Sequence, residues 1–166
     1  MIRCIAFDCF GTVFDMSSVA REEIAAYVNH VKREDFSPFQ FPKSWYELKS
    51  HPDSAEGIKQ LQAAGYYCVT LSNGPVGMTR YISKAAGIEW NHLIDLVMHQ
   101  AYKPKNLKAY LSINRELGFD PHETLMVTAN PTFGDIEGAK AVGMPSQVIR
   151  HGHPNTIIEL AEMLSK

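Results

Sequence analysis

Asp8 is an acidic residue that directly follows the short apolar run 2–7 and precedes Gly11. A short apolar run bounded by a turn residue predicts a buried strand. A carboxylate at the end of such a strand is presented to the crevice above the sheet, where it can act as a nucleophile that forms a covalent intermediate. Asp8 is therefore the first candidate for a catalytic residue.

Further polar residues that could assist this nucleophile lie later in the chain. A carboxylate nucleophile needs a neighbouring cation that keeps it ionised and offsets developing charge, and Lys103 is the best candidate. The Ser72 hydroxyl and the Asn73 amide could bind an oxygen of the substrate, whereas Asp135 could orient Lys103 or coordinate a metal. Simpler interpretations remain open, because 72–75 could be an ordinary turn and Lys103 an exposed helix start.

Strand-like and helix-like segments alternate along the chain. The predicted strands are 2–7, 66–71, 92–98, 125–129 and 147–150. The predicted helices that connect and follow them are 53–64, 76–86, 104–117, 133–142 and 154–164. This alternation predicts a parallel α/β sheet with helices on both faces. Ligands of such sheets bind beyond the carboxyl ends of the strands. Four candidate residues are expected there: Asp8, Ser72, Asn73 and Asn130.

Residues 16–51 interrupt this alternation after the first strand. They contain one helical stretch that Ser17 or Ser18 could cap, an irregular Phe- and Pro-rich segment at 35–42, and a short helical turn at 44–48. We expect residues 1–166 to form a single domain in which 16–51 is an insertion. Its aromatic residues could line a substrate pocket, form a dimer contact, or fold the insertion onto the core: Phe36, Phe39, Phe41, Trp45 and Tyr46.

Four segments resemble, in order and across almost the whole chain, the four motifs of the haloacid dehalogenase superfamily. They are residues 5–12, 70–74, Lys103-Pro104 and 127–139. One such motif is a weak signal, whereas four at suitable spacing are a strong one. The resemblance implies a Rossmann-like, three-layer α/β/α fold with a parallel sheet, in which 16–51 is a reduced helical cap. It also implies a hydrolase that forms a covalent aspartyl intermediate on Asp8.

Two positions depart from the pattern of the phosphatases in this superfamily. Those enzymes resemble this chain but carry a second Asp two residues after the nucleophile, which protonates the leaving alcohol. Phe10 stands at that position here and cannot transfer a proton. The phosphatases also carry a magnesium-binding Asp where Asn130 stands. An aromatic residue before Gly-Thr, and Ser-Asn in the second motif, resemble instead the 2-haloacid dehalogenases, which are metal-free and release a halide that needs no proton.

The resemblance therefore implies a 2-haloacid dehalogenase-like hydrolase without a cofactor. Its expected catalytic residues are Asp8, Lys103, Ser72 and Asp135. Its expected substrate contacts are Phe10, Thr12, Asn73 and Asn130. One feature opposes this interpretation: the cap of those dehalogenases is large and supplies an arginine to the halide, whereas here neither Arg21 nor Arg33 can be assigned that role from the sequence.

Two alternatives remain open at this stage. The first is a magnesium-dependent small-molecule phosphatase, in which the metal would be held at positions Asp8, Phe10 and Asp135. The second is a binding or regulatory protein of the same fold with little turnover, because positions 10 and 130 have lost chemically active side chains.

The composition limits the partners of the protein. Its 16 basic and 18 acidic residues give a net charge of −2, which offers no footprint for nucleic acid or for an anionic membrane. The sequence shows no apolar stretch of membrane-spanning length, and because residue 2 already begins the first predicted strand we expect no leader peptide. Three cysteines without metal-site spacing indicate buried thiols in a reducing compartment. We expect a cytoplasmic protein that acts on a small molecule, with solvated loop histidines that include His151 and His153; the oligomeric state stays open.

Overall fold

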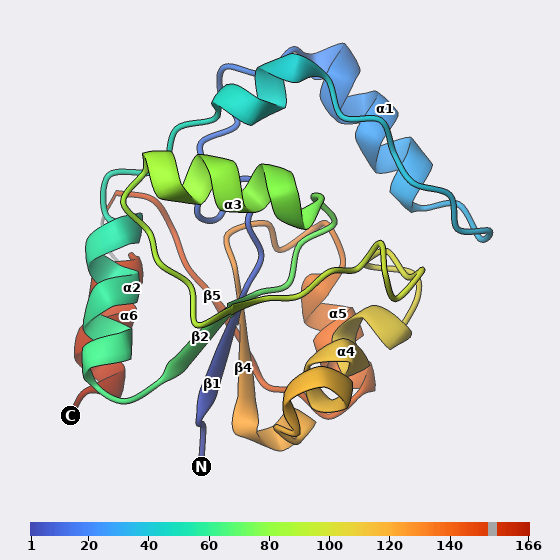
Figure 1. Cartoon of the computed structure of the whole chain (residues 1–166). Coiled ribbons are helices and arrows are strands. Elements are labelled where there is room, and N and C mark those ends of the chain that lie inside the picture. The colour runs from blue at the N-terminus through green and yellow to red at the C-terminus, as the bar shows by residue number, and fades with distance from the viewer. Residues whose placement is uncertain (153–155) are drawn as a thin grey trace.

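The computed structural model describes residues 1–152 and 156–166. Its centre is a five-stranded sheet with the order β3-β2-β1-β4-β5, in which every neighbouring pair is parallel. The strands are β1 (Cys4–Phe7), β2 (Tyr67–Thr70), β3 (His92–Leu93), β4 (Thr124–Thr128) and β5 (Ser146–Val148). The predicted parallel α/β sheet is confirmed, with the strand that precedes Asp8 at its centre (Figure 1).

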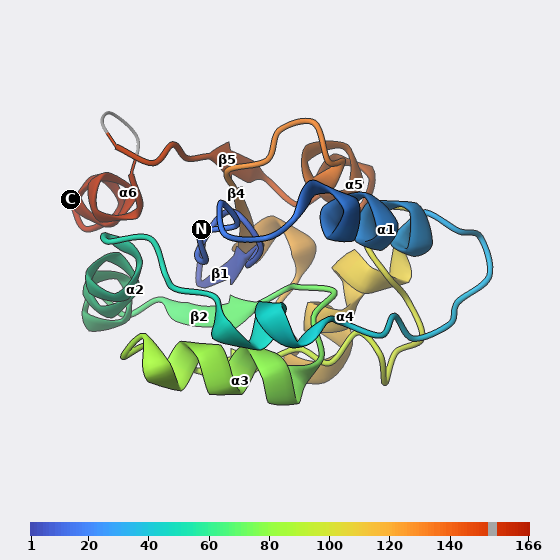
Figure 2. The same cartoon turned by 90° about the horizontal axis from the view of Figure 1, so that it is seen from above.

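Helices cover both faces of the sheet and complete the three predicted layers (Figures 1 and 2). One face packs against α2 (Ser54–Ala63) and α6 (Ile157–Leu164), and the other against α4 (Lys108–Leu117) and α5 (Asp135–Ala141). The helix α3 (Val76–Ala85) follows β2, and the short 3-10 turn η2 (Pro121–Glu123) leads into β4. All four residues of β1 are fully buried. A strand that is covered on both faces is expected to have a continuous apolar sequence, as residues 4–7 have.

Some element boundaries differ from the expected ones. The strand expected over 92–98 ends at Leu93, because the Asp95 carboxylate accepts hydrogen bonds from the backbone N–H groups of Val97 and Met98 and closes a turn. The helix expected over 104–117 begins only at Lys108. The last helix begins at Ile157, and the predicted start at Pro154 lies outside the described residues.

The first helix of the chain, α1 (Arg21–Val31), is not capped as expected. Its N-cap residue is Ala20, and no side chain caps the helix. The Ser17 backbone N–H instead donates to the Asp15 carboxylate at 2.9 Å, in a turn that precedes the helix. The prediction of a cap at Ser17 or Ser18 is therefore wrong, because this turn ends before the helix starts.

Residues 16–51, which we call the cap segment, lie above the carboxyl ends of the strands (Figure 1). The segment consists of α1, an irregular stretch and the 3-10 helix η1 (Lys43–Glu47). The chain enters and leaves it side by side: Asp15 N–H donates to the Lys49 carbonyl at 2.8 Å, and His51 N–H donates to the Val13 carbonyl at 2.9 Å. We call this hydrogen-bonded pair of segments the stem.

Most of the aromatic residues of the cap segment fold it onto the core. The Phe10 ring, which follows β1, lies 5.0 Å from Trp45 and 5.6 Å from both Tyr27 and Phe41, measured between ring centroids. Trp45 is fully buried. Of the three roles considered for this cluster, the structure favours packing of the cap segment against the residues that follow β1.

The three cysteines are buried and free, as expected. Burial raises the pKa of the Cys4 and Cys68 thiols to about 12, and burial also raises the pKa of Cys9, where the Asp8 charge adds to the effect. Since the thiolate is the reactive form, none of the three thiols is suited to nucleophilic chemistry. Within the described ranges 1–152 and 156–166, no helix is long and apolar enough to cross a membrane.

Candidate active site

Three charged side chains meet beyond the carboxyl ends of the strands. The Lys103 ammonium lies 3.2 Å from Asp8 Oδ1 and 2.9 Å from Asp135 Oδ2. Asp8 comes from the end of β1, Lys103 from the loop before α4, and Asp135 from the first turn of α5. The structure therefore brings together the predicted nucleophile, the predicted cation and the predicted orienting carboxylate.

Lys103 is buried, with only 1% of its surface exposed. This excludes the interpretation of Lys103 as an exposed helix start. Burial alone would lower the pKa of the ammonium, but the charges of Asp135 and Asp8 and their hydrogen bonds outweigh burial and raise this pKa above its usual value. The group is therefore held in its charged form.

Asn73 fixes the backbone on which Lys103 is mounted. Its side-chain oxygen accepts from Lys103 N–H at 2.8 Å, and its Nδ2 donates to the Lys103 carbonyl at 2.9 Å. Nδ2 also donates to the hydroxyl of Tyr27 in the cap segment at 3.1 Å. The Asn73 side chain, expected to contact a substrate oxygen, is thus fully engaged in joining the cation and the cap segment to the end of β2.

The two oxygens of the Asp8 carboxylate have different surroundings. Oδ2 accepts hydrogen bonds from Thr12 Oγ1 at 2.9 Å, Asn130 Nδ2 at 2.9 Å and Thr128 Oγ1 at 3.3 Å. In the described part of the chain, Oδ1 has Lys103 as its single partner. Oδ1 therefore keeps lone-pair capacity, whereas Oδ2 is saturated.

Backbone N–H groups set the direction of both hydroxyl bonds to Asp8. Ala129 N–H donates to Thr12 Oγ1 at 2.8 Å, and Asn130 N–H donates to Thr128 Oγ1 at 3.0 Å. Each hydroxyl thus accepts from the backbone and turns its own proton to Oδ2. Thr128 was not among the expected site residues. The sequence gives no register for this pairing, whereas in the structure Val127 lies opposite Phe7, so the next residue of β4 ends beside Asp8.

Asp135 is fully buried and held by two donors, Lys103 and the Tyr110 hydroxyl, the latter at 2.6 Å from Oδ1. Burial and the neighbouring Asp8 charge raise the pKa of Asp135, while Lys103 and Tyr110 act against this rise. A side chain at Gly138 would overlap the Tyr110 ring, so the glycine that follows Asp135 by three positions lets this donor approach. Asp135 is therefore placed to orient Lys103.

The same residues do not fit a magnesium ion. Every oxygen of Asp8 and Asp135 already accepts a hydrogen bond, and the Lys103 ammonium stands between the two carboxylates. The Phe10 carbonyl, the third expected ligand, accepts from Asn130 Nδ2 at 2.8 Å. Magnesium requires oxygen ligands in octahedral geometry. The described residues also contain no group of three metal-ligating side chains.

A cavity of about 420 Å³ opens beside Asp8, between the cap segment and the loop before α5. Its lining combines Asp8 and Asn130 with mainly apolar side chains, which include Phe10, Ile24, Tyr27, Val28 and Phe133. Thr12 and Ser72 are buried and do not line it, and the Ser72 hydroxyl accepts from Gly74 N–H at 3.2 Å. Of the expected substrate contacts, Phe10 and Asn130 therefore face this cavity.

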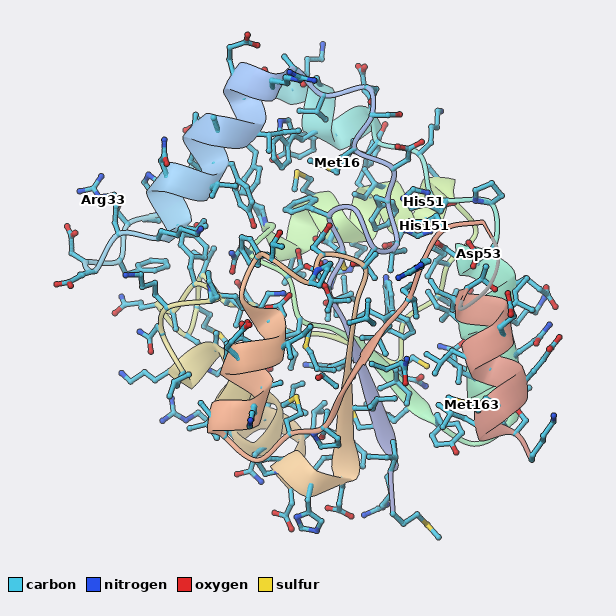
Figure 3. The ribbon with its side chains drawn as sticks, turned by 180° about the vertical axis from the view of Figure 1, so that it is seen from behind. Met16, Arg33, His51, Asp53, His151 and Met163 are labelled. Carbon is cyan, nitrogen blue, oxygen red and sulfur yellow. The ribbon has the colours of Figure 1, made fainter. Side chains whose placement is uncertain are left out.

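Two histidines stack beside the loop that follows Asp8. The rings of His51 and His151 lie 3.3 Å apart between centroids, with 14° between their planes, and Figure 3 shows them side by side near Asp53. His151 Nε2 donates to the Gly11 carbonyl at 2.8 Å. The expectation that His151 is a solvated loop residue is wrong, because its ring is packed against His51 and bonded to the loop; His153 lies outside the described residues.

This pair predicts a loss of stability in mild acid. Burial and the neighbouring His151 lower the pKa of His51 below 6.5, although Asp15 and Asp53 oppose the shift. The unfolded chain therefore binds more protons, so the stabilisation is present above about pH 6.5 and is lost as the pH falls below it. We expect the urea concentration at the midpoint of unfolding to decrease as the pH is lowered from 7 to 5. The substitution His51→Phe, which keeps the ring stack, should weaken this pH dependence. The exposed His122→Phe should not weaken it; an equal effect in both variants would contradict the assignment.

Comparison with known proteins finds a matching family model and several similar sequences for this chain. The sequence matches the model of the haloacid dehalogenase-like hydrolases over residues 39–143. It is 29% identical over 143 residues to an (S)-2-haloacid dehalogenase of Burkholderia cepacia, covering 74% of this chain and 58% of that protein. It is 30% identical over 188 aligned positions to a haloacetate dehalogenase of Moraxella sp. (strain B), covering 86% of this chain and 83% of that protein.

The fold has a close counterpart among solved structures. The structure of an L-2-haloacid dehalogenase superposes with a TM-score of 0.81 at 20% sequence identity, covering 99% of this chain and 100% of that one. At this identity the likeness concerns the fold alone. The family model matches more than half of the chain, and the Moraxella protein is 30% identical to it. These two matches show the family as well as the fold. The chain belongs to the haloacid dehalogenase-like hydrolases.

Proposed function

We propose that the protein is a 2-haloacid dehalogenase-like hydrolase that works through a covalent ester on Asp8. The observation that carries this proposal is the asymmetry of the Asp8 carboxylate. Oδ2 accepts three hydrogen bonds, whereas the Lys103 ammonium is the one donor to Oδ1 among the residues that the structure describes. Oδ1 is therefore the attacking oxygen, and Lys103 holds the carboxylate ionised and in position.

In the first step Oδ1 forms a bond to the substrate carbon that carries the halogen. The carbon–halogen bond breaks, and the halide leaves with the bonding electrons. This step needs no proton, in agreement with the phenylalanine at position 10. The product of the step is an ester between Asp8 and the substrate.

In the second step a water molecule attacks the Asp8 Cγ of this ester. Negative charge then develops on Oδ2, to which Thr12, Thr128 and Asn130 already donate. Preorganised donors aimed at the atom where charge develops are among the largest contributions to catalysis. Collapse of the intermediate releases a 2-hydroxy acid and one proton and restores the carboxylate. The three donors thus serve the hydrolytic step rather than the attack.

The cap segment offers no arginine to the departing halide. Arg33 is exposed, is paired with Asp35 at 3.4 Å, and points away from the core in Figure 3. Arg21 is exposed as well and does not line the cavity. A different cation of the cap segment, Lys32 after the end of α1, lines the cavity beside Asp8. We assign to Lys32 the charge that faces the leaving halide.

A screen of halo-acids and phosphomonoesters, each with excess EDTA and with added magnesium, tests this function. We expect halide release from 2-halo-acids that persists in EDTA, and no phosphate release. Magnesium-dependent phosphate release would reject the proposal in favour of a phosphatase. An absence of turnover on both panels would favour a binding or regulatory protein.

Asn130→Asp supplies a second test of the chemistry. The substitution replaces a donor at 2.9 Å from Asp8 Oδ2 with a second carboxylate. This removes one of the three donors and adds a like charge, so we expect halide release to fall by about 100-fold or more. The measurement is kcat on a 2-halo-acid in EDTA. A rise in activity that requires magnesium would instead support the phosphatase interpretation.

A further inference from the structure

A second cavity adjoins the cavity beside Asp8. It has a volume of about 490 Å³ and shares the lining residues Lys32, Thr132 and Phe133 with the first. The second cavity extends over Pro104 and Leu107, in front of α4 and α5. We call the combined space the apolar trough, and its apolar walls are formed chiefly by Ile24, Val28, Pro104, Leu107 and Phe133.

The lining of the trough separates an ionic end from an apolar length. The Asp8 carboxylate lies at the inner end. Toward the outer end, Leu107 is 41% exposed although it is a large apolar side chain. Lys32, Lys105 and Glu137 contribute charge to the outer cavity, and its other lining residues are mostly apolar or small. Apolar surface of this kind gains free energy when a ligand removes it from water.

The size of the trough is greater than a two-carbon or three-carbon acid requires. The inner cavity alone, at about 420 Å³, falls in the range of roughly 300–1,000 Å³ that holds ligands of drug-like size. The cap segment contributes a single residue, Lys32, to the lining of the outer cavity, whose other lining residues belong to 104–107 and 132–138. A ligand bound at Asp8 therefore has room to extend outward.

Resting on the function proposed above, we propose that the substrate is a 2-halo-acid with a medium-length alkyl or aryl chain. Its reacting carbon lies at Asp8 Oδ1, and its chain lies in the apolar trough against Phe133 and Leu107. The chemistry at Asp8 is unchanged. The trough adds selectivity for chain length.

Equilibrium binding tests the trough without relying on turnover. Isothermal titration calorimetry with propionate and with octanoate compares a short and a medium chain that cannot react. Each methylene removed from water contributes roughly fourfold in affinity, and the trough is open on one side. We therefore expect octanoate to bind at least about tenfold more tightly than propionate. Equal affinity for the two acids would overturn the proposal.

Two leucines with the same exposure supply a matched pair of variants. Leu107→Asp places a charge in the trough, at the residue that precedes α4, whereas Leu111→Asp places a charge on α4 outside the trough. The two leucines are 41% and 42% exposed. Leu107→Asp should lower the octanoate-to-propionate affinity ratio at least about fivefold, and Leu111→Asp should leave it unchanged. The same loss in both variants would overturn the proposal.

Measurements of turnover distinguish a failure of the chain-length proposal from a failure of the proposed function. We expect kcat/KM to be higher for 2-bromooctanoate than for 2-bromopropionate, and we expect Leu107→Asp to reduce this preference. Hydrolysis without any preference for the longer chain would overturn the chain-length inference and keep the dehalogenase function. If no halo-acid is hydrolysed but octanoate binding depends on Leu107, the proposed function fails and the trough stands as an acyl-chain site.

Discussion

Asp8→Asn is expected to reduce halide release from any 2-halo-acid by at least about 10⁴-fold, because a neutral amide oxygen is a far weaker nucleophile than a carboxylate oxygen. The fold should persist. The asparagine oxygen can still accept from Thr12 and Asn130, and one of the two negative charges around Lys103 is removed. The measurements are steady-state halide release and the thermal unfolding midpoint.

Asp15→Asn is the matched control, because Asp15 lies in the same loop but its carboxylate accepts from Ser17 rather than from a residue of the charged cluster. It should retain nearly full activity. A single turnover in oxygen-18 water adds a second readout, since hydrolysis at Cγ places the label in Asp8 rather than in the first product molecule. Label that appears directly in the hydroxy acid, or an Asp8→Asn protein that retains most of its activity, would exclude the ester mechanism.

Lys103→Met is expected to lower turnover by a few orders of magnitude and also to destabilise the protein. The substitution keeps the length of the side chain but leaves Asp8 and Asp135 buried without a cation. Removing one partner of a buried ion pair typically costs about 3–5 kcal/mol of unfolding free energy. An exposed lysine at a helix start, the simpler interpretation that the sequence left open, would cost little stability when replaced, whereas Lys103 is buried.

A double variant separates the two effects of Lys103. In Lys103→Met with Asp135→Asn the cluster loses one positive and one negative charge, so part of the stability should return while turnover stays low. Lys108→Met, an exposed lysine on α4, serves as the control for the loss of a surface charge. Recovery of turnover together with stability would mean that Lys103 acts only as a structural cation, and the proposed mechanism would have to be revised.

The parts of the fold that follow from the sequence are those that depend on local patterns. Continuous apolar runs located the central strands β1, β2 and β4, and the rule that parallel strands present ligands at their carboxyl ends placed Asp8 beside the later candidates. Lys103 and Asp135 were identified by the resemblance of Lys103-Pro104 and of residues 127–139 to two of the family motifs. The apolar sequence of 92–98 predicted a longer strand than the structure has. The Asp95 carboxylate accepts hydrogen bonds from the backbone N–H groups of Val97 and Met98 and so ends the strand within this segment.

The parts that do not follow from the sequence depend on contacts between distant segments. The stack of His51 on His151 joins residues 100 positions apart, and nothing in either neighbourhood predicts it. The difference between Oδ1 and Oδ2 of Asp8 depends on which hydroxyls the backbone orients. The complete engagement of Asn73 requires Tyr27 from the cap segment. Such partners are fixed by the packing of the chain, not by spacing along it.

The stem makes the cap segment exchangeable. Its two sides are joined by hydrogen bonds in which Asp15 N–H donates to the Lys49 carbonyl and His51 N–H donates to the Val13 carbonyl. The chain therefore re-enters the core where it left it. The alignment with the Moraxella relative spans 188 positions, more than the 166 residues of this chain, so that protein contains segments that this one lacks. Lengthening a loop whose ends are already held together costs little free energy. We therefore expect that cap segments of different length can be grafted between Asp15 and Lys49. Such grafts would change which molecules reach Asp8 and would leave the sheet that positions Asp8 unaltered.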